Sequence, residues 1–161
     1  MRIKTIVDES FTEYREPVMY IGSSSCDGKC CIEAGIPLSV CHNDGWRKNA
    51  IFTMVDDDII ARYLKNNLTK AICFAGLEPF EQFEEVLDFV SRLRNEHRCL
   101  DPVIIYTGFD EDEVEVEVEA LKDFKNIVIK FGRYVPGQES HYDEVLGVHL
   151  ASDNQYAKII S

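Results

Sequence analysis

The sequence predicts an α/β fold: a single-domain partial (open) βα barrel with a mostly parallel sheet. Three observations lead to this fold class. Apolar runs of strand length alternate with segments of helical periodicity, which is the pattern of consecutive βαβ units. The runs are apolar at successive positions, as in parallel strands that are covered on both faces. The chain has 161 residues, which suits one domain over residues 1–161 but holds too few such units for a closed eight-stranded barrel.

The N-terminal part predicts two strands and then an irregular segment. The pattern allows a short edge strand over Ile3–Val7, and an apolar run predicts a strand over Pro17–Gly22. Residues 23–49 contain four residues that interrupt helices, namely Gly28, Gly35, Pro37 and Gly45. We therefore expect irregular backbone there. A connection of that length inside a compact domain is typically functional.

The middle of the chain predicts a helix, a strand and a second helix. Val55–Asp58 can start and cap a helix, because acidic residues favour a helix N-terminus. An apolar stripe follows at helical spacing, made of Ile59, Ile60, Tyr63 and Leu64. Asn66 and Asn67 end this helix. Ala71–Phe74 is a continuous apolar strand, Gly76–Pro79 is a turn, and a long helix is expected over Phe80–Arg98.

The C-terminal part is less regular. Pro102–Tyr106 predicts a strand. Residues 111–119 alternate glutamate and valine as a strand would, yet three apolar residues also lie at helical spacing, namely Val114, Val118 and Leu121. We choose a helix with a solvated acidic face, because a strand follows at Asn126–Phe131 and strand–helix–strand matches the rest of the chain. Val145–Leu150 is the expected last strand.

Composition limits the partners and the compartment. The formal net charge of −12 argues against nucleic acid or an anionic membrane as the main partner. No segment approaches the ~20 apolar residues of a membrane span, and the N-terminus has no apolar stretch of signal-peptide length. We therefore expect a cytoplasmic protein. In that compartment six cysteines indicate metal or redox chemistry more than disulfides.

Four of the cysteines lie within residues 23–49: Cys26, Cys30, Cys31 and Cys41. They follow a predicted strand, and α/β folds bind ligands at the carboxyl ends of their strands. Three thiolates can hold a 4Fe–4S cluster and leave one iron without a protein ligand, as a catalytic site requires. The alternative is a zinc site with His42 as fourth ligand. Structural zinc prefers paired C-x2-C spacing, however, and no second such pair exists.

Five segments carry a resemblance to a known family and occur in the family's order: Cys26–Asn43, Ala75–Phe80, Ile105–Phe109, Phe131–Tyr134 and Leu146–Gln155. The chain resembles the radical S-adenosylmethionine (SAM) superfamily, which holds its cluster with three cysteines after the first barrel strand, typically spaced C-x3-C-x2-C. Ala75–Phe80 resembles the family's G-G-E-P segment. The remaining segments resemble one small branch, the anaerobic ribonucleoside-triphosphate reductase activating proteins.

The resemblance implies Cys26, Cys30 and Cys41 as the ligands of the cluster. Ten residues separate Cys30 from Cys41, where the family has two, so we interpret the extra residues as an insertion. Cys31 remains an alternative for the middle ligand. Three further positions depart from the family pattern: Val40 replaces an aromatic residue, Leu77 replaces the second glycine of G-G-E, and Ala151 replaces a glycine of the closing motif.

The resemblance also implies SAM as a second cofactor. The residues expected around the cofactors are Val40, His42, Asn43, Gly76, Leu77, Glu78, Ser152 and Asn154. The segment Gly76–Glu78 would present backbone groups and a carboxylate to the SAM amino group, and backbone amides at Gly28 and near Asn43 would donate hydrogen bonds to cluster sulfides. Ser152 and Asn154 would help to close the SAM pocket. No catalytic residue is expected beyond the cluster ligands.

The implied activity is reductive cleavage of SAM to methionine and a 5′-deoxyadenosyl radical. The radical would abstract hydrogen from a glycine of a large glycyl radical subunit, the anaerobic ribonucleotide reductase, and the electron would come from a donor such as flavodoxin. A second hypothesis is a non-catalytic iron–sulfur (or zinc) binding protein on the same scaffold, which Leu77 and the enlarged loop favour. The other two cysteines are expected outside the site, Cys73 in the core and Cys99 near a helix end.

Overall fold

The structure, a computed structural model, describes residues 1–161. The strands are β1 (Arg2–Ser10), β2 (Val18–Ser23), β3 (Phe52–Thr53), β4 (Ala71–Ala75), β5 (Val103–Tyr106), β6 (Ile127–Phe131), β7 (His141–Asp143), β8 (Val148–Leu150) and β9 (Tyr156–Ile159). The α-helices are α1 (Lys29–Glu33), α2 (Asp44–Lys48), α3 (Asp56–Lys65), α4 (Phe83–Asn95) and α5 (Glu115–Leu121). Short 3₁₀ helices span Leu38–Val40, Pro79–Gln82 and Glu111–Glu113.

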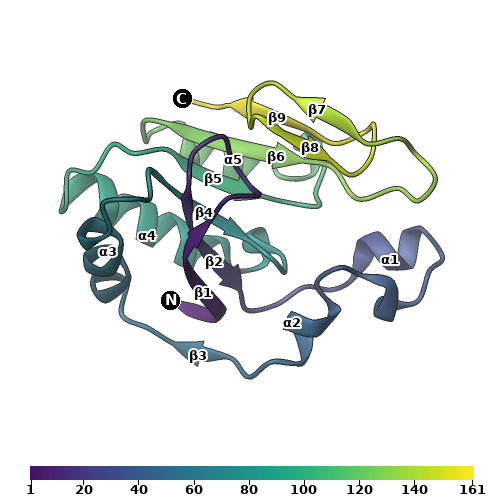
Figure 1. The fold of residues 1–161 in the computed structure, drawn as a ribbon, viewed down its shortest axis with the longest axis horizontal. Coiled ribbons are helices and arrows are strands. Elements are labelled where there is room, and N and C mark those ends of the chain that lie inside the picture. The colour runs from purple at the N-terminus through teal and green to yellow at the C-terminus, as the bar shows by residue number, and fades with distance from the viewer.

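Seven strands form one mixed sheet in the order β3-β1-β2-β4-β5-β6-β9. Its centre, β2-β4-β5-β6, is parallel, whereas β1 and β9 pair antiparallel to β2 and β6. The strands β7 and β8 form a separate hairpin (Figure 1). The first and last strands of the order do not pair, so the sheet stays open. The α/β class and the largely parallel, unclosed sheet are confirmed, and they are consistent with a partial βα barrel.

The two faces of the sheet belong to two separate core clusters. Alternate residues of a strand face opposite sides, and in β4 the outward residues Ile72 and Phe74 join the larger core cluster against the helices. The inward residues of β4 are Ala71, Cys73 and Ala75, which belong to a smaller second cluster. Leu150 of the hairpin β7–β8 belongs to the same cluster. Cys73 is fully buried there, as expected of a core residue.

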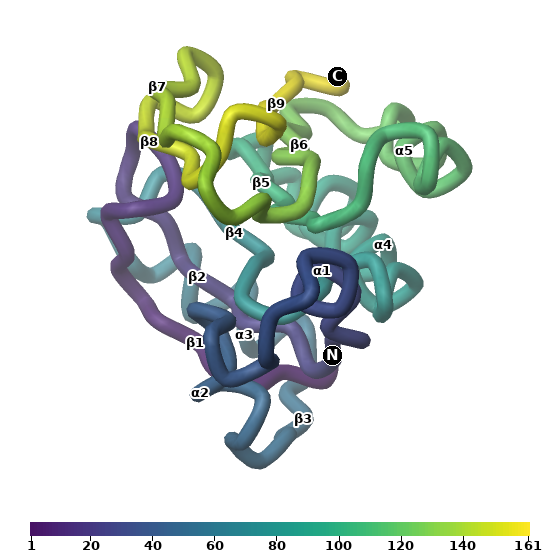
Figure 2. The backbone as a smooth tube through the Cα atoms, turned by 90° about the vertical axis from the view of Figure 1, so that its right-hand side faces the viewer, coloured from purple at the N-terminus to yellow at the C-terminus, as the bar shows by residue number.

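The helices α3, α4 and α5 cover the outer face. Figure 2 shows α4 and α5 on one side of the row of strands and the hairpin β7–β8 on the other. In α3 the predicted stripe buries Ile59, Ile60 and Tyr63, but Leu64 is exposed. The acidic start of α3 makes no side-chain cap. Instead, Asp56 accepts a hydrogen bond from the N-terminal amine of Met1 at 2.9 Å, which ties β1 to this helix.

Several boundaries differ from the prediction. The segment expected to be irregular contains α1 and α2, two helices of five residues each, which lie at the far end of the sheet from α3 (Figure 1). The helix expected over Phe80–Arg98 begins with a 3₁₀ turn and ends at Asn95. The prediction of Val145–Leu150 as the last strand is wrong, because β8 belongs to the separate hairpin and β9 is the last strand, at one edge of the sheet. Residues 111–119 are helical, as predicted.

None of the helices is both long enough and apolar enough to cross a membrane.

Candidate functional site

The four parallel strands end at one side of the sheet, and the segments that follow them surround a common cavity. Carboxyl ends of neighbouring parallel strands lie at the same edge, which is where α/β folds bind ligands. The cavity has a volume of about 740 Å³, within the range of small-molecule sites. Its walls include Cys26 after β2, Gly76 after β4, Thr107 after β5 and Gly132 after β6.

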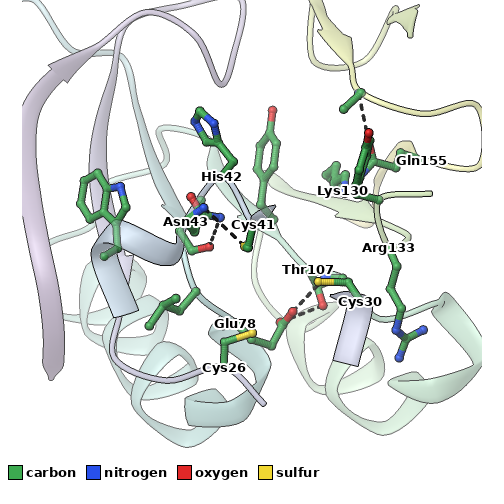
Figure 3. A pocket seen from close by; sticks show the side chains of 18 of the residues that line it. Cys26, Cys30, Cys41, His42, Asn43, Glu78, Thr107, Lys130, Arg133 and Gln155 are labelled. Atoms are coloured by element: carbon green, nitrogen blue, oxygen red, sulfur yellow. Dashed lines mark hydrogen bonds between the residues drawn. The ribbon is translucent and has the colours of Figure 1, made fainter. Parts of the chain in front are cut away.

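All four loop cysteines line this cavity, the three assigned ligands and Cys31 alike. Cys26, Cys30 and Cys41 are free, half-buried thiols in its wall, and Figure 3 shows them around the same space. Cys30 lies in α1, and Cys41 follows the 3₁₀ helix Leu38–Val40. The ten residues between them fold back, so the long spacing in sequence still returns the third thiol to the cavity. Cys31 is buried beside them.

Backbone amides donate hydrogen bonds to two of the candidate ligand sulfurs. The N–H of Gly28 donates to Cys26 Sγ at 3.3 Å, and the N–H of Asn43 donates to Cys41 Sγ at 3.4 Å. These are the two loop positions from which amide donors were expected, although here they donate to the cysteine sulfurs. Gly28 has φ +76°, a conformation that glycine adopts without strain. Such hydrogen bonds stabilise thiolate ligands and tune the reduction potential of an iron–sulfur centre.

The donor set fits a cluster better than a single zinc ion. Sulfur ligands of one tetrahedral zinc lie roughly 4 Å apart, because each Zn–S bond is about 2.3 Å. The group of metal-binding side chains whose ligand atoms all lie within 4.8 Å of one another is Cys26, Asp27 and Glu81. It contains one thiol and excludes His42, which is exposed. Three cysteines spread around a wide cavity suit the larger 4Fe–4S group.

Burial favours the protonated form of two of the loop thiols, Cys26 and Cys31. Burial raises the pKa of Cys26 to about 12, and the nearby carboxylates of Glu81 and Glu78 add to this shift. Burial likewise raises the pKa of Cys31 to about 11, with further contributions from the thiols of Cys30 and Cys41. Because thiolate is the form that binds metal, loading of this site releases protons and depends on pH.

The turn after β4 forms the wall beside the cysteines. Gly76 has φ +86°, and a Cβ there would stand 2.7 Å from the hydroxyl oxygen of Tyr20, so the backbone reaches the cavity only because the residue is glycine. The side-chain amide of Asn43 donates a hydrogen bond to the Gly76 carbonyl. Leu77 is buried and also lines the cavity.

Glu78 has a different local role from the one expected. Its Oε1 accepts hydrogen bonds from Thr107 Oγ1 at 2.8 Å and from the N–H of Phe80 at 3.1 Å, and its Oε2 accepts one from the N–H of Gly108 at 2.8 Å. The carboxyl group therefore joins the end of β4 to the end of β5. Burial raises its pKa to about 7, although the three donors act in the opposite direction.

Lys130 is a functional candidate that sequence reasoning missed. It ends the apolar run of β6, lines the cavity and is buried, and its Nζ donates to the carbonyl of Gly132 at 2.7 Å. Burial lowers its pKa to about 8, while the Glu78 carboxylate acts to raise it. A lone lysine inside a strand of otherwise buried apolar residues is the sequence signal that would have identified it, because lysine is rarely buried without a role.

The remaining predicted residues divide into two groups. Val40, His42 and Asn43 line the cavity. Ser152 and Asn154 do not line it, which corrects the expectation that they close the cofactor pocket. Ser152 Oγ accepts from the N–H of Val135 at 3.3 Å, and Asn154 Nδ2 donates to the carbonyl of Arg133 at 2.8 Å. Their side chains support the wall from behind, and their neighbours Ala151 and Gln155 form its inner surface.

Comparison with known proteins gives one match. The family model described as a 4Fe-4S single cluster domain matches residues 24–156, a range that begins just before the first candidate ligand and includes the whole cavity wall after it. No curated protein and no solved structure matches the chain.

Proposed function

The chain belongs to the 4Fe-4S single cluster domain family, and from this premise we propose that it is an activating enzyme that forms a glycyl radical on a large partner, the anaerobic ribonucleotide reductase. Members of the family are radical SAM enzymes, mostly activases of glycyl radical enzymes. The cofactors are a 4Fe–4S cluster and SAM. The observation that carries the proposal is the hydrogen bond from Asn43 to Gly76, which joins the cysteine loop to the SAM-side turn across one cavity.

The cysteine loop supplies the metal ligands. Cys26, Cys30 and Cys41 would hold the cluster, and a set of three leaves one iron for a further ligand. When bound, the cluster and SAM together supply a one-electron cleavage that yields methionine and a 5′-deoxyadenosyl radical. The protein's part is to bind, orient and shield these groups. The amide donors of Gly28 and Asn43 favour the thiolate form of the ligands that they contact.

Two charged or polar groups of the opposite wall suit the amino-acid part of SAM. The buried ammonium of Lys130 is placed to attract a carboxylate, and it has no acidic side chain among its hydrogen-bond partners. The backbone of Gly76 and Leu77 faces the same cavity and offers acceptors for an ammonium group. Glu78 fixes this turn through Thr107 and Gly108, so its carboxylate acts by positioning the backbone.

The open fold supports a macromolecular partner. The sheet does not close on itself, so the cavity can admit a loop of a second protein. Phe131–Tyr134 and Leu146–Gln155, which resemble segments of the ribonucleotide reductase branch, supply Gly132, Arg133 and Gln155 to the cavity wall. These features support a macromolecular substrate that presents a glycine, and a flavodoxin-type protein as the electron donor.

The test is formation of the glycyl radical itself. Reconstituted protein, reductant and SAM are mixed without oxygen with the large subunit of the anaerobic ribonucleotide reductase from the same organism. We expect the doublet of a glycyl radical in the electron paramagnetic resonance spectrum, absent with Cys41→Ala. SAM cleavage without any radical on that subunit would contradict the proposed partner but leave the radical SAM chemistry intact.

A second candidate function rests on Leu77. Its side chain occupies the cavity wall beside Gly76, in the place where the resembling family has glycine. A side chain there narrows the space for the SAM amino group and favours a non-catalytic iron–sulfur protein. A reconstituted, brown protein that leaves SAM intact would support this candidate, and a Leu77→Gly variant that then gains SAM cleavage would assign the loss to this side chain.

A further inference from the structure

The helix α1 carries Cys30 but has little apolar anchorage. It has five residues, and Cys31 is the one that is buried, while Ile32 is 68% exposed. Helices this short are not stable on their own in water. Packing alone therefore does not explain how the helix holds Cys30 in the cavity wall.

The polar contacts of this segment with the rest of the protein are concentrated in two side chains. Between residues 29 and 40 the backbone hydrogen bonds are all local to the loop. The contacts that leave the loop are made by Lys29 and Glu33, the first and last residues of α1. Both ends of the helix that carries Cys30 are thus held by charged side chains.

These two residues form a ring of alternating charges with Glu113 and Arg133, which we call the ionic clasp. Lys29 Nζ lies 2.7 Å from Glu113 Oε1 and 3.7 Å from Glu33 Oε1. Arg133 binds Glu113 in a bidentate way, at 2.6 Å and 2.9 Å, and its Nε lies 3.2 Å from Glu33 Oε2. Each charge of the ring therefore has two partners of the opposite sign.

The surroundings of the ionic clasp indicate that it contributes more to stability than an ordinary surface ion pair. Exposed pairs contribute about 0–1 kcal/mol, but bidentate geometry and networks contribute more. The Arg133 side chain is only 11% exposed. The ring of Phe109 lies under both cations, 5.9 Å from Lys29 Nζ and 5.5 Å from Arg133 Cζ. Glu113 also accepts from the N–H of Asp110 at 2.9 Å, which fixes its carboxylate.

We propose that the ionic clasp, through Glu113, is the positioning device that holds Cys30 as a cluster ligand across the insertion. Glu113 follows β5 and Arg133 follows β6, so the clasp connects α1 to the opposite wall of the cavity. Glu113 is a positioning residue, because it acts on the cluster through α1. This inference rests on Cys30 as a ligand, within the proposed function, but not on SAM cleavage or on the partner.

The test measures cluster retention in the absence of SAM and partner. Reconstituted wild type, Glu113→Gln and Lys29→Gln are mixed with an excess of iron chelator without oxygen, and the loss of visible absorption is followed. Glu115→Gln is the matched control. This substitution removes the same charge from the same acidic run, but Glu115 makes no ion pair. We expect the two clasp variants to lose the cluster about three- to tenfold faster at low salt.

Salt and stability distinguish positioning from general destabilisation. In 1 M NaCl, where the Debye length is about 3 Å, the wild-type rate should rise toward that of the variants. The unfolding midpoint of cluster-free Lys29→Gln should stay within error of the wild-type value. If Glu113→Gln does not fold, the rate of cluster loss from Lys29→Gln alone tests the ionic clasp.

Equal rates in all four proteins would overturn the ionic clasp, as would an equal acceleration in Glu115→Gln. A wild type that remains colourless would instead overturn the cluster assignment on which both proposals rest.

Discussion

The side-chain amide of Asn43 donates a hydrogen bond to the backbone carbonyl of Gly76. Asn43 lies two residues after Cys41, and its own N–H donates to the Cys41 sulfur. One residue therefore contacts both a candidate metal ligand and the turn after β4. Its backbone serves the first contact and its side chain the second, so the two can be separated by mutation.

Asn43→Ala should lower SAM affinity without loss of iron. The variant keeps the backbone donor to Cys41 but frees the Gly76 turn, and a net hydrogen bond contributes about 0.5–1.5 kcal/mol. We expect SAM binding to the reconstituted protein to weaken by about two- to tenfold, measured by equilibrium dialysis, with the iron content of wild type. A variant that loses its iron would show that the side chain serves the cluster loop instead.

Cys41→Ala should abolish the visible absorption of the reconstituted protein, whereas Cys31→Ala should largely retain it. Cys41 and Cys31 both line the cavity, but Cys31 is only 3% exposed whereas Cys41 is half-buried. Removal of one of three ligands leaves the cluster with two thiolates, which is not sufficient to hold it. Chemical analysis of bound iron and sulfide checks that the loss of absorption reflects loss of the cluster. The reverse pattern would exchange the roles of these cysteines and refute the ligand assignment.

Gly76→Ala should destabilise the fold and weaken SAM binding together. The left-handed backbone costs a non-glycine residue about 1–2 kcal/mol, and the new Cβ would stand 2.7 Å from the Tyr20 hydroxyl oxygen. We expect the free energy of unfolding to fall by about 1–3 kcal/mol in urea titrations. Gly45→Ala is the control: it lies in α2 with open space around it, so it should be neutral or stabilising.

Glu78 makes the stability of the cluster-free protein depend on pH. Its pKa is about 7 in the folded state against 4.5 when unperturbed, so between these values the folded protein binds a proton that the unfolded chain has released. The stability contribution is therefore present below about pH 4.5 and is lost as the pH rises toward 7, by roughly 3 kcal/mol at most.

Glu78→Gln removes this titration. The difference in unfolding free energy between wild type and the variant should change across pH 4.5–7 and become constant above it, in urea titrations at a series of pH values. A difference that stays the same at every pH would show that Glu78 has the same pKa in the folded and unfolded states, with its three donors offsetting its burial.

The parts of the fold that the sequence predicted share a strong local pattern. The strands β2, β4, β5 and β6 are continuous apolar runs, and the helices α3 and α4 have clear apolar stripes, so periodicity identified them. For α5 the periodicity was ambiguous, and the strand–helix–strand order decided for a helix. The antiparallel edge strands β3 and β9 were harder to predict. β3 has two residues, and β9 (Tyr156–Ile159) mixes polar and apolar residues because half of it faces solvent. Such strands depend on pairing with β1 and β6, which is a tertiary property.

The candidate site was predicted only in part, because some of its residues have a local signal and others depend on tertiary contacts. Cysteines and glycines at strand ends stand out, so the residues from Cys26 to Asn43 and from Gly76 to Glu78 could be named. The contacts at the two ends of α1 could not be predicted, because Lys29 and Glu33 resemble any solvated pair until the fold brings Glu113 and Arg133 beside them. Ser152 and Asn154 were placed in the pocket by resemblance, but the turn directs their side chains toward the backbone of Val135 and Arg133.

Cleavage of SAM tests the central claim most directly. Protein reconstituted with iron and sulfide without oxygen, then reduced in the presence of SAM, should release 5′-deoxyadenosine and methionine in equal amounts, detected by chromatography. Cys26→Ala should release neither. A wild type that binds a full cluster yet leaves SAM unchanged, or that binds no iron at all, would contradict the account.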